Sequence, residues 1–507
     1  MNKNIPLALS SGILLGIPFC IPSLFFLILF AWIPLLFLEE KLKDHHNPYL
    51  LFNYTFLSFT VWNVMAYWWV AQAHILGVIL IISINSMLLA LIFWLISKAR
   101  QSLHISILLP FIIIWLGFEY FHTQWDLAWP WLNLGNAFAS APSWIQWYEF
   151  TGTRGGSLWV ILINYSIFEI IRRERDFSYS QVFILLVLFG IPLLYSSVGN
   201  DIKPENTSAN RTFALIQPNL DPYTEKFVPE SEKKYFNDFI KSADSICNVD
   251  APDFLFGPET LILQSIDEKN PNTSEYYQQL SAMKEKYPKT NFLIGVHSKI
   301  DDESFNSALL IGDSVPQFYH KTKLVPMFER IPFDKYLGFL NKYSLEIGGY
   351  NGTYSSRNET NYFMADSTAI VPVVCFESIF GDYCAKRIPE SNGFICMITN
   401  DGWWKNTPGY MHHFNFSRIR AIETRRDYIR VANNGISAHI NSKGTIIAKT
   451  SWWNKTILSG NLSLLSGRTF YSEHGDYIGR TCLFFALLLL IFVKIRTYTL
   501  RLSGRKF

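Results

Sequence analysis

Cys375 stands where an apolar segment of the chain ends, and Glu377 follows two residues later. The residues before the cysteine, 371–374, read Val-Pro-Val-Val, and a short run of β-branched residues bounded by polar ones predicts a buried strand. A cysteine at the end of a strand is placed like a catalytic nucleophile. Free cysteine is also among the most commonly buried residue types, so this segment alone leaves a plain core cysteine open.

Two more apolar runs end in charged residues. Glu259 follows Phe256-Gly257-Pro258, and Lys321 follows Tyr319-His320. A charge next to a buried strand is costly unless it is paired or has a function. A carboxylate, an ammonium and a thiol together suit acyl transfer. The thiolate attacks, the carboxylate accepts and returns its proton, and the ammonium lowers the thiol pKa and stabilises the oxyanion.

Three neighbouring charges have alternative interpretations. Lys323 could be the working amine instead of Lys321, but we interpret it as a solvated surface charge. Glu329, eight residues after Lys321, could be a salt-bridge partner, and Glu377 could orient a backbone amide. For both carboxylates a direct catalytic role also stays open.

The middle of the chain alternates short apolar runs with charged segments of helical spacing. This alternation predicts an α/β domain in which helices cover a sheet and active groups lie at strand ends. We expect strands at 213–216, 254–256, 292–296, 307–311, 369–374, 393–398 and 435–440, and helices at 230–247, 273–286 and 413–427.

The rest of the chain is apolar enough for a membrane domain. Hydrophobic residues make up 49% of the 507 residues, and they concentrate before about residue 200 and near the end. We expect a transmembrane domain at 1–197, a polar linker at 199–206, a catalytic domain within 198–476, and a last helix with a basic tail at 477–507. About eight spans are predicted: two short ones within 5–38, then 50–72, 75–97, 104–122, 157–172, 179–197 and 477–494.

Basic residues follow every second predicted span. Because positive loops face the cytoplasm, this pattern predicts that the catalytic domain lies outside the cytoplasm and that the tail lies inside. The basic residues are Lys41, Lys43, Lys98, Arg100, Arg172, Arg173, Arg175, Lys494, Arg496, Arg501, Arg505 and Lys506.

One predicted external loop, 125–147, is rich in tryptophan and includes Trp129-Pro130-Trp131. Tryptophan collects at membrane interfaces, so a simple aromatic belt is one interpretation. The alternative is a stiff amphipathic rim where lipid enters. The net charge of +3 gives no reason to expect nucleic acid as a partner.

Neither a metal centre nor a disulfide framework is expected. His412 and His413 are adjacent rather than four residues apart, so they do not form the usual helical ligand pair. The six cysteines do not have the spacing of a disulfide framework. Cys384 and Cys396 could form a pair, whereas Cys375 should stay free because a disulfide would block a nucleophile.

Several of these segments resemble a known family. Gly-Pro-Glu at 257–259, Lys-x-x-Leu-Val-Pro-x-x-Glu at 321–329 and Cys-x-Glu at 375–377 resemble the nitrilase superfamily. The flanking sequences resemble the apolipoprotein N-acyltransferases, and the resemblance covers nearly the whole chain. These flanking segments are 129–135, Thr399-Asn400-Asp401-Gly402-Trp403-Trp404, His413-Phe414, 418–423, 432–437, 469–471 and 475–476.

The resemblance implies an α-β-β-α sandwich with Glu259 as general base, Lys321 as oxyanion stabiliser and Cys375 as acylated nucleophile. It implies supporting roles for Glu329 and Glu377. It also places Trp403 or Trp404 near the lipid entrance, although either could be an ordinary core or interface aromatic.

The sequence departs from the family pattern at two places. Phe376 stands where relatives often have tyrosine, and Tyr223 and Phe227 occupy the region where a tryptophan is common. Neither departure touches Glu259, Lys321 or Cys375.

The implied function is transfer of a fatty acyl chain from a membrane phospholipid to the N-terminal diacylglyceryl-cysteine of a lipoprotein, at the outer face of a bacterial inner membrane. No cofactor is implied. Two alternatives stay open: a membrane-tethered nitrilase-type amidase that uses water as acceptor, and a non-enzymatic carrier of lipid or lipoprotein.

Overall fold

The computed structural model describes residues 4–47, 49–173, 179–199, 207–228, 231–337, 354–357 and 362–502. Nearly all of the linker expected at 199–206 lies outside these ranges, as do Arg175, Arg505 and Lys506 of the expected basic clusters. The chain divides into two compact units. The first comprises residues 1–71, 75–201 and 476–507, and the second comprises 72–74 and 202–475.

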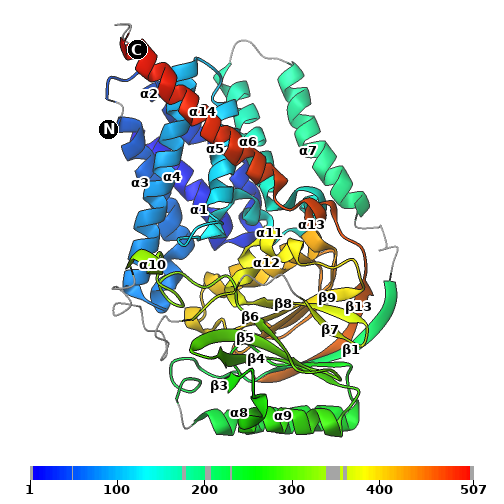
Figure 1. The fold of residues 1–507 in the computed structure, drawn as a ribbon. Helices are drawn as coiled ribbons and strands as arrows, with labels where there is room; N and C mark the ends of the chain where they lie inside the picture. The colour runs from blue at the N-terminus through cyan, green and yellow to red at the C-terminus, as the bar shows by residue number, and fades with distance from the viewer. Residues whose placement is uncertain are drawn as a thin grey trace. The chain divides into compact units, whose positions relative to one another are not determined.

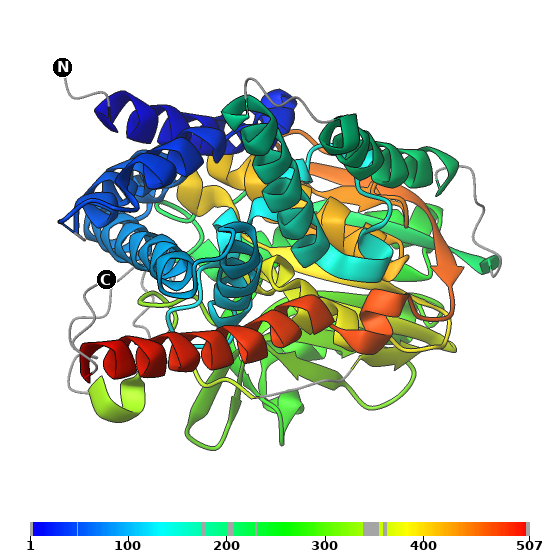
Figure 2. The same ribbon diagram turned by 90° about the horizontal axis from the view of Figure 1, so that it is seen from above.

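The first unit is helical (Figure 1), and α14 at its C-terminal end is one long continuous helix in both views (Figure 2). Its α-helices are α1 (Asn4–Cys20), α2 (Ile33–Leu42), α3 (Tyr49–Tyr67), α4 (Ile75–Leu103), α5 (Leu108–Phe121), α6 (Tyr148–Arg172), α7 (Tyr179–Gly199) and α14 (Tyr477–Leu502). Short 3-10 helices include η1 (Pro22–Leu29), η3 (Pro130–Leu132), η4 (Leu134–Phe138) and η5 (Pro142–Trp144).

Four helical segments among the described residues are long and apolar enough to cross a membrane: Pro22–Leu42, Ile75–Leu103, Tyr179–Val198 and Tyr477–Thr499. Asn4–Cys20 and Leu108–Phe121 are apolar but shorter. Helices thus occupy the expected positions, but by length and composition they support fewer spans than the eight predicted. Side chains such as Phe183 and Leu186 on α7 and Phe484 and Leu487 on α14 are apolar and exposed, which suits contact with lipid.

A buried ionic network ties three helical segments of the first unit together. Arg154 of α6 pairs with Glu119 of α5 at 3.1 Å and with Asp476, just before α14, at 3.0 Å. Glu119 also accepts a hydrogen bond from the backbone N–H of Leu134 at 2.9 Å. Charges inside an apolar unit are retained when they are paired, so this network fixes where α5, α6 and the start of α14 meet.

The second unit is built on one continuous set of paired strands in the order β12-β11-β10-β9-β13-β1-β2-β4-β5-β6, with β8 beside β9, β7 beside β8 and β3 beside β4. Their bounds are β1 (Thr207–Gln217), β2 (Phe254–Phe256), β3 (Ile262–Asp267), β4 (Asn291–Ile300), β5 (Glu303–Ile311), β6 (Gln317–His320), β7 (Phe363–Ala365), β8 (Thr368–Val374), β9 (Gly393–Thr399), β10 (Tyr428–Ala432), β11 (Ala438–Ile440), β12 (Ile446–Lys449) and β13 (Thr456–Leu465).

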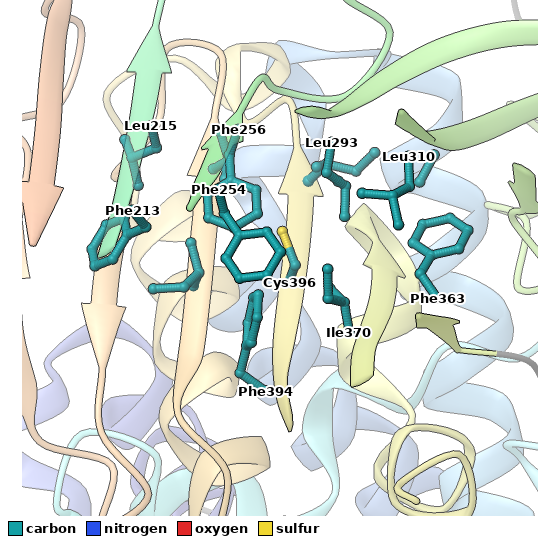
Figure 3. Close-up of a cluster of buried hydrophobic side chains, with 14 of the residues drawn as sticks. Phe213, Leu215, Phe254, Phe256, Leu293, Leu310, Phe363, Ile370, Phe394 and Cys396 are labelled. Atoms are coloured by element: carbon teal, nitrogen blue, oxygen red, sulfur yellow. The ribbon is translucent and has the colours of Figure 1, made fainter. Parts of the chain in front are cut away.

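The strands form two halves that face each other across a shared core. The halves are joined where β13 meets β9 at the single pair Leu465 and Gly393. Figure 3 shows Phe213 and Phe254 of one half packed toward Phe394 and Cys396 of the other. Because β8 and β9 are buried along their whole length, they read as continuous apolar runs without alternation.

Helices cover the outer face of each half (Figure 1). A second core lies under α8 (Glu232–Val249) and α9 (Glu275–Lys286), and a third lies under α11 (Gly381–Lys386) and α12 (Pro408–Thr424). The order of layers is therefore helix, sheet, sheet, helix, which is the sandwich that the resemblance implied.

The structure corrects two details of the sequence interpretation. The strand expected at 435–440 is shorter, Ala438–Ile440, and the helix expected at 413–427 ends at Thr424, before the unpredicted strand β10 at Tyr428–Ala432. The helix ends early because Arg425 adopts a left-handed conformation, with φ 49°.

All six cysteines are free, so the pairing of Cys384 with Cys396 was wrong. The two thiols belong to different cores. Cys396 faces the core between the two halves of the sheet, and Cys384 of α11 packs in the core under α12.

Candidate active site

Three strand ends position the three candidate residues. Glu259 lies three residues after β2, Lys321 directly after β6, and Cys375 directly after β8. β2 runs parallel to β4, and β6 also runs parallel to β4 because both pair antiparallel with β5. The carboxyl ends of β2 and β6 therefore reach the same edge, where ligands of α/β folds usually bind.

Lys321 is at the centre of a buried ionic cluster. Its Nζ lies 3.2 Å from Oε1 of Glu259 and 2.7 Å from Oε1 of Glu329. Asn306 of β5 donates to the same oxygen of Glu259 at 2.8 Å, and its backbone C=O accepts from the N–H of Lys321 at 2.8 Å. Lys321 is thus held by both carboxylates and by the backbone of β5, and Glu259 is held by Lys321 and by Asn306.

Cys375 occupies a sharp turn between β8 and the 3-10 helix η9 (Cys375–Ile379). Its φ is +51°, a backbone conformation that costs energy for residues other than glycine and that persists only when neighbours enforce it. Its carbonyl oxygen accepts a hydrogen bond from Oγ of Ser378 at 2.9 Å. The residue is 9% exposed, so it is almost completely buried.

The charges define the resting protonation state. Burial and the Glu259 carboxylate raise the pKa of the Cys375 thiol, while Lys321 and a hydrogen bond with Thr399 lower it less. Burial opposes ionisation of Glu259, but Lys321, Lys226 and Asn306 together hold its pKa below the usual range. The resting site therefore pairs a neutral thiol with a carboxylate that is ready to act as a base.

Lys321 and Glu329 complete this picture. Burial disfavours the ammonium of Lys321, yet Glu259 and Glu329 outweigh burial and raise its pKa, so it stays charged. The pKa of Glu329 is raised by burial and by Glu259, against the effect of Lys321. Glu329 is further held by the backbone N–H of Val325 at 2.8 Å, so it fixes the ammonium and the loop that follows it.

The chain is similar to known proteins along nearly its whole length. The carbon-nitrogen hydrolase family model matches residues 214–470, and the model of the apolipoprotein N-acyltransferase N-terminal domain matches residues 11–166. The apolipoprotein N-acyltransferase of Chlorobaculum tepidum is 28% identical, with 98% of this chain and 97% of that protein covered. The enzyme of the same name from Geobacter metallireducens is 26% identical, with 95% and 93% covered.

The chain belongs to the carbon-nitrogen hydrolase family, among its apolipoprotein N-acyltransferases. It is therefore an acyltransferase with a carbon-nitrogen hydrolase catalytic domain. Solved structures with which it aligns include a CN-hydrolase superfamily protein from Xanthomonas campestris, with 15% identity, a TM-score of 0.38, and 53% of this chain and 95% of that one covered. Another is a nitrilase-superfamily protein from Saccharomyces cerevisiae, with 13% identity, a TM-score of 0.38, and 54% and 95% covered.

Glu377 links two segments of the candidate site through hydrogen bonds. Its buried carboxylate accepts hydrogen bonds from the N–H of Val374 at 2.8 Å, the N–H of Thr322 at 2.7 Å and Oη of Tyr319 at 2.8 Å. It thus links the strand end that carries the cysteine to the segment that carries Lys321. Of the two roles that the sequence left open, this geometry favours orientation of backbone amides.

Replacing Glu377 with glutamine should weaken both the fold and the reaction. The amide nitrogen would face a backbone N–H, so we expect a loss of about 2–3 kcal/mol in unfolding free energy and a fall of about tenfold or more in acylation rate. Thermal unfolding and single-turnover acylation measure the two effects. Glu303→Gln, at an exposed ion pair with Arg357, is the matched control and should change neither. A variant as inactive as one without the cysteine would instead assign Glu377 a direct catalytic role.

Lys323 contacts two aromatic rings. Its ammonium lies over the rings of Phe380 and Tyr383, at 5.2 Å and 5.8 Å from their centroids. It is half-buried, so our interpretation as a solvated charge was wrong, although the choice of Lys321 agrees with the geometry.

A buried Asp-His-Arg cluster behind Cys375 was missed by the sequence analysis. Nε2 of His413 lies 3.0 Å from the carbonyl oxygen of Cys375, and its Nδ1 lies 2.8 Å from Asp401. Arg430 donates to the other oxygen of Asp401 at 2.8 Å. Burial opposes ionisation of Asp401, but Arg430 and His413 keep its pKa below the usual range. The cluster braces the strained backbone of the nucleophile. In the sequence, Asp401 and His413 stand out only as members of family-like segments, and no local pattern indicates that they meet behind Cys375.

Gly295 of β4 lies directly against the backbone of Glu259. A Cβ at this position would stand 2.5 Å from Cα of Glu259 and 2.6 Å from the carbonyl oxygen of Pro258. The N–H of Gly295 donates to that same carbonyl at 3.1 Å. The glycine therefore allows the close approach that holds Glu259 at the site.

Gly295→Ala should push Glu259 away from Lys321. We expect acylation to slow by about 100-fold, since displacements near 1 Å have effects of that size, and unfolding free energy to fall by about 1–3 kcal/mol. Gly460→Ala in β13 is the control, because its Cβ would meet only the ring of Phe213, at 3.1 Å. Equal activity of the two variants would show that the approach of β4 does not position the base.

The four tryptophans of the sequence analysis divide between the units. In the second unit, the ring of Trp403 stacks on Phe227 at 5.4 Å and meets Tyr223 edge-on at 5.7 Å, and Trp404 packs against His413 at 5.3 Å. Tyr223 and Phe227, the two departures from the family pattern, thus contact Trp403 directly.

Trp129 and Trp131 lie in the first unit. They pack on each other at 5.9 Å, and Trp131 packs against Trp69 at 5.2 Å. Trp131 is 2% exposed, so it is part of the helical core rather than an open rim. Trp129 remains partly exposed.

Proposed function

We propose that this enzyme moves a fatty acyl chain from a membrane phospholipid, through a thioester on Cys375, to the α-amine of the N-terminal S-diacylglyceryl-cysteine of an apolipoprotein. The observation that carries the proposal is the buried cluster in which Lys321 contacts Glu259 and Glu329, and in which Glu259 and Lys321 both act on the Cys375 thiol. The names of the full-length relatives support the acceptor.

In the first half-reaction, Sγ of Cys375 attacks the ester carbonyl carbon while Glu259 takes the thiol proton. The ammonium of Lys321 stabilises the oxyanion that forms. The tetrahedral intermediate collapses, the C–O bond to the glycerol breaks, and Glu259 gives its proton to the departing alkoxide. Lysophospholipid leaves, and the acyl chain remains on the sulfur.

In the second half-reaction, the acceptor amine attacks the thioester carbonyl. Glu259 takes a proton from the amine nitrogen, Lys321 again faces the oxyanion, and the C–S bond breaks as Cys375 recovers its proton. A single nucleophile that meets two lipid substrates in turn requires this ping-pong order. Glu329 and Glu377 act through Lys321 and the backbone.

The location of the site follows from the same proposal. About eight spans, with a catalytic domain at about 198–476 between the seventh and the eighth, would place the cysteine on the periplasmic side, where both substrates would be found, and the tail in the cytoplasm. The exposed apolar side chains of α7 and α14 support contact with lipid. The aromatic cluster of Tyr223, Phe227 and Trp403 offers an amphipathic surface suited to acyl chains.

The test is to supply the purified protein in vesicles with phosphatidylethanolamine labelled in its acyl chain. A synthetic diacylglyceryl-cysteine peptide with a free N-terminus is the acceptor, and the same peptide with an acetylated N-terminus is the control. We expect labelled amide with the first peptide only. Labelled free fatty acid in equal amount with either peptide, and no amide, would show that water is the acceptor and that the protein acts as a hydrolase.

A further inference from the structure

Lys226 is a buried lysine outside every motif that the sequence analysis used. It lies in the turn between β1 and α8, and its side chain is 1% exposed. Its Nζ donates hydrogen bonds to the backbone carbonyl of Glu259 at 2.8 Å and to Oγ1 of Thr260 at 2.7 Å. It therefore holds both residues of the turn that carries the proposed base.

That turn is strained. Thr260 has φ +50°, which is costly for a β-branched residue. A conformation of this kind persists only where the surroundings enforce it. The ammonium of Lys226 contacts the turn at two points, the carbonyl of Glu259 that precedes the strained residue and the hydroxyl of Thr260 itself. The contacts are thus well placed to keep Glu259 facing Lys321.

The ammonium has no carboxylate within ion-pair distance among the described residues. Its electrostatic partners are the carboxylate of Glu259 and the thiol of Cys375, and it also lies 5.6 Å from the ring centroid of Phe227. Burial of an unpaired charge is unfavourable, and a neutral residue that filled the same space would avoid that cost. The positive charge therefore requires a reason beyond packing.

The charges of the site supply that reason. Glu259 and Glu329 are two carboxylates, and they share the single ammonium of Lys321. Without another cation the ionised cluster carries an excess negative charge in a buried place, and it faces a thiol that must become an anion. A second ammonium makes the cluster neutral before the substrate binds.

We propose that Lys226 is a positioning residue for acyl transfer: it fixes the turn of Glu259 and Thr260, and it supplies the second positive charge that balances the two carboxylates. The inference rests on the proposed function of Cys375. Lys226 touches no reacting atom in this account, because it acts through Glu259 and through the electrostatic potential at the sulfur.

Two substitutions separate the contributions of Lys226. Lys226→Met removes both the charge and the hydrogen bonds, whereas Lys226→Gln removes the charge and retains a donor. We expect single-turnover acylation of Cys375 by labelled phospholipid to fall by about 100-fold in Lys226→Met, because the base is displaced and the charge is lost. In Lys226→Gln we expect a fall of about tenfold, because only the charge is lost.

Lys284→Met is the matched control. Lys284 is also buried, donates to a backbone carbonyl, that of Pro288 at 2.5 Å, and pairs with Asp313 at 2.8 Å. Its removal should lower the unfolding temperature but leave acylation within about twofold. A loss of acylation in the Lys226 variants no larger than in this control would overturn the proposal.

The pH profile gives a readout that a merely structural role would not change. Burial lowers the pKa of Lys226 to about 8, against the opposing effects of Glu259 and Cys375. The other titratable groups near its side chain or backbone are His297, whose pKa burial and Lys226 lower to about 4, and Tyr235, whose hydroxyl donates to the Lys226 carbonyl and has a pKa raised by burial. Neither changes charge near pH 8.

The wild-type acylation rate should therefore decline as the pH rises through about 8, because Lys226 loses its charge there. Lys226→Met should be slower throughout and should lack that decline. A variant that folds and retains the wild-type profile would overturn the inference while leaving the proposed function intact. Absence of acylation in the wild-type protein would instead refute the proposed function itself.

Discussion

Cys375→Ala should abolish acyl transfer, with a loss of about 10⁴-fold or more. In the proposed mechanism, the substitution removes the sulfur atom that carries the acyl chain between the two half-reactions. Glu259 and Lys321 would remain in place, but an activated water or amine would have to attack the phospholipid directly. The fold should survive, because alanine is smaller and tolerates the positive φ of this position no worse than cysteine does. Transfer of labelled acyl chains to the acceptor peptide measures the effect.

Cys396→Ala is the matched control for this experiment. Cys396 is another buried free thiol of the same unit, but it faces the core between the two halves of the sheet. Its replacement should retain transfer within a few-fold, and it should lower the unfolding free energy slightly. If both variants kept activity, Cys375 would not be the residue that carries the acyl group.

Lys321→Met should cost both stability and activity. The substitution leaves Glu259 and Glu329 buried side by side without the ammonium that they share. Removing one partner of a buried charge network typically costs about 3–5 kcal/mol. Acylation should fall by about 10³-fold, since a buried group that stabilises an oxyanion contributes on that scale. Thermal unfolding and single-turnover acylation measure the two losses.

The pH dependence of this variant follows from the same contacts. In the wild-type protein Lys321 helps to hold the pKa of Glu259 below its usual range, so the base is ionised at neutral pH. Without the ammonium the pKa of Glu259 rises, and the acidic side of the rate profile should move to higher pH. Lys323→Met is the control and should leave the profile unchanged, because Lys323 lies over Phe380 and Tyr383. An unchanged acidic limb in Lys321→Met would contradict the assigned pairing.

The sequence was sufficient to bring Glu259, Lys321 and Cys375 to attention because each follows an apolar run, and strand ends in this fold meet at shared edges. It did not indicate Lys226, and it placed Asp401 and His413 in family-like segments without showing that the two residues pair. Lys226 lies in a turn with no apolar run before it, and the role of His413 depends on α12 crossing behind β8, a contact between distant segments that no local pattern predicts.

In the membrane unit and at the cysteines, too, contacts between distant segments could not be predicted from local sequence patterns. Hydropathy located the helices but not the burial of Trp131, which depends on its contact with Trp69 more than 60 residues earlier. The pairing of Cys384 with Cys396 failed for a related reason, because residues on β9 face one core or the other by alternation, and Cys396 faces away from α11.

The acyl-enzyme itself gives the most direct test of the central claim. The wild-type protein is incubated with phosphatidylethanolamine of one defined acyl chain and no acceptor, then digested and analysed by mass spectrometry. We expect the peptide containing Cys375 to gain the mass of that acyl group, and hydroxylamine or the acceptor peptide to remove it. Transfer that proceeds while Cys375 remains unmodified, or an acyl group found on another residue, would contradict the proposed thioester on Cys375.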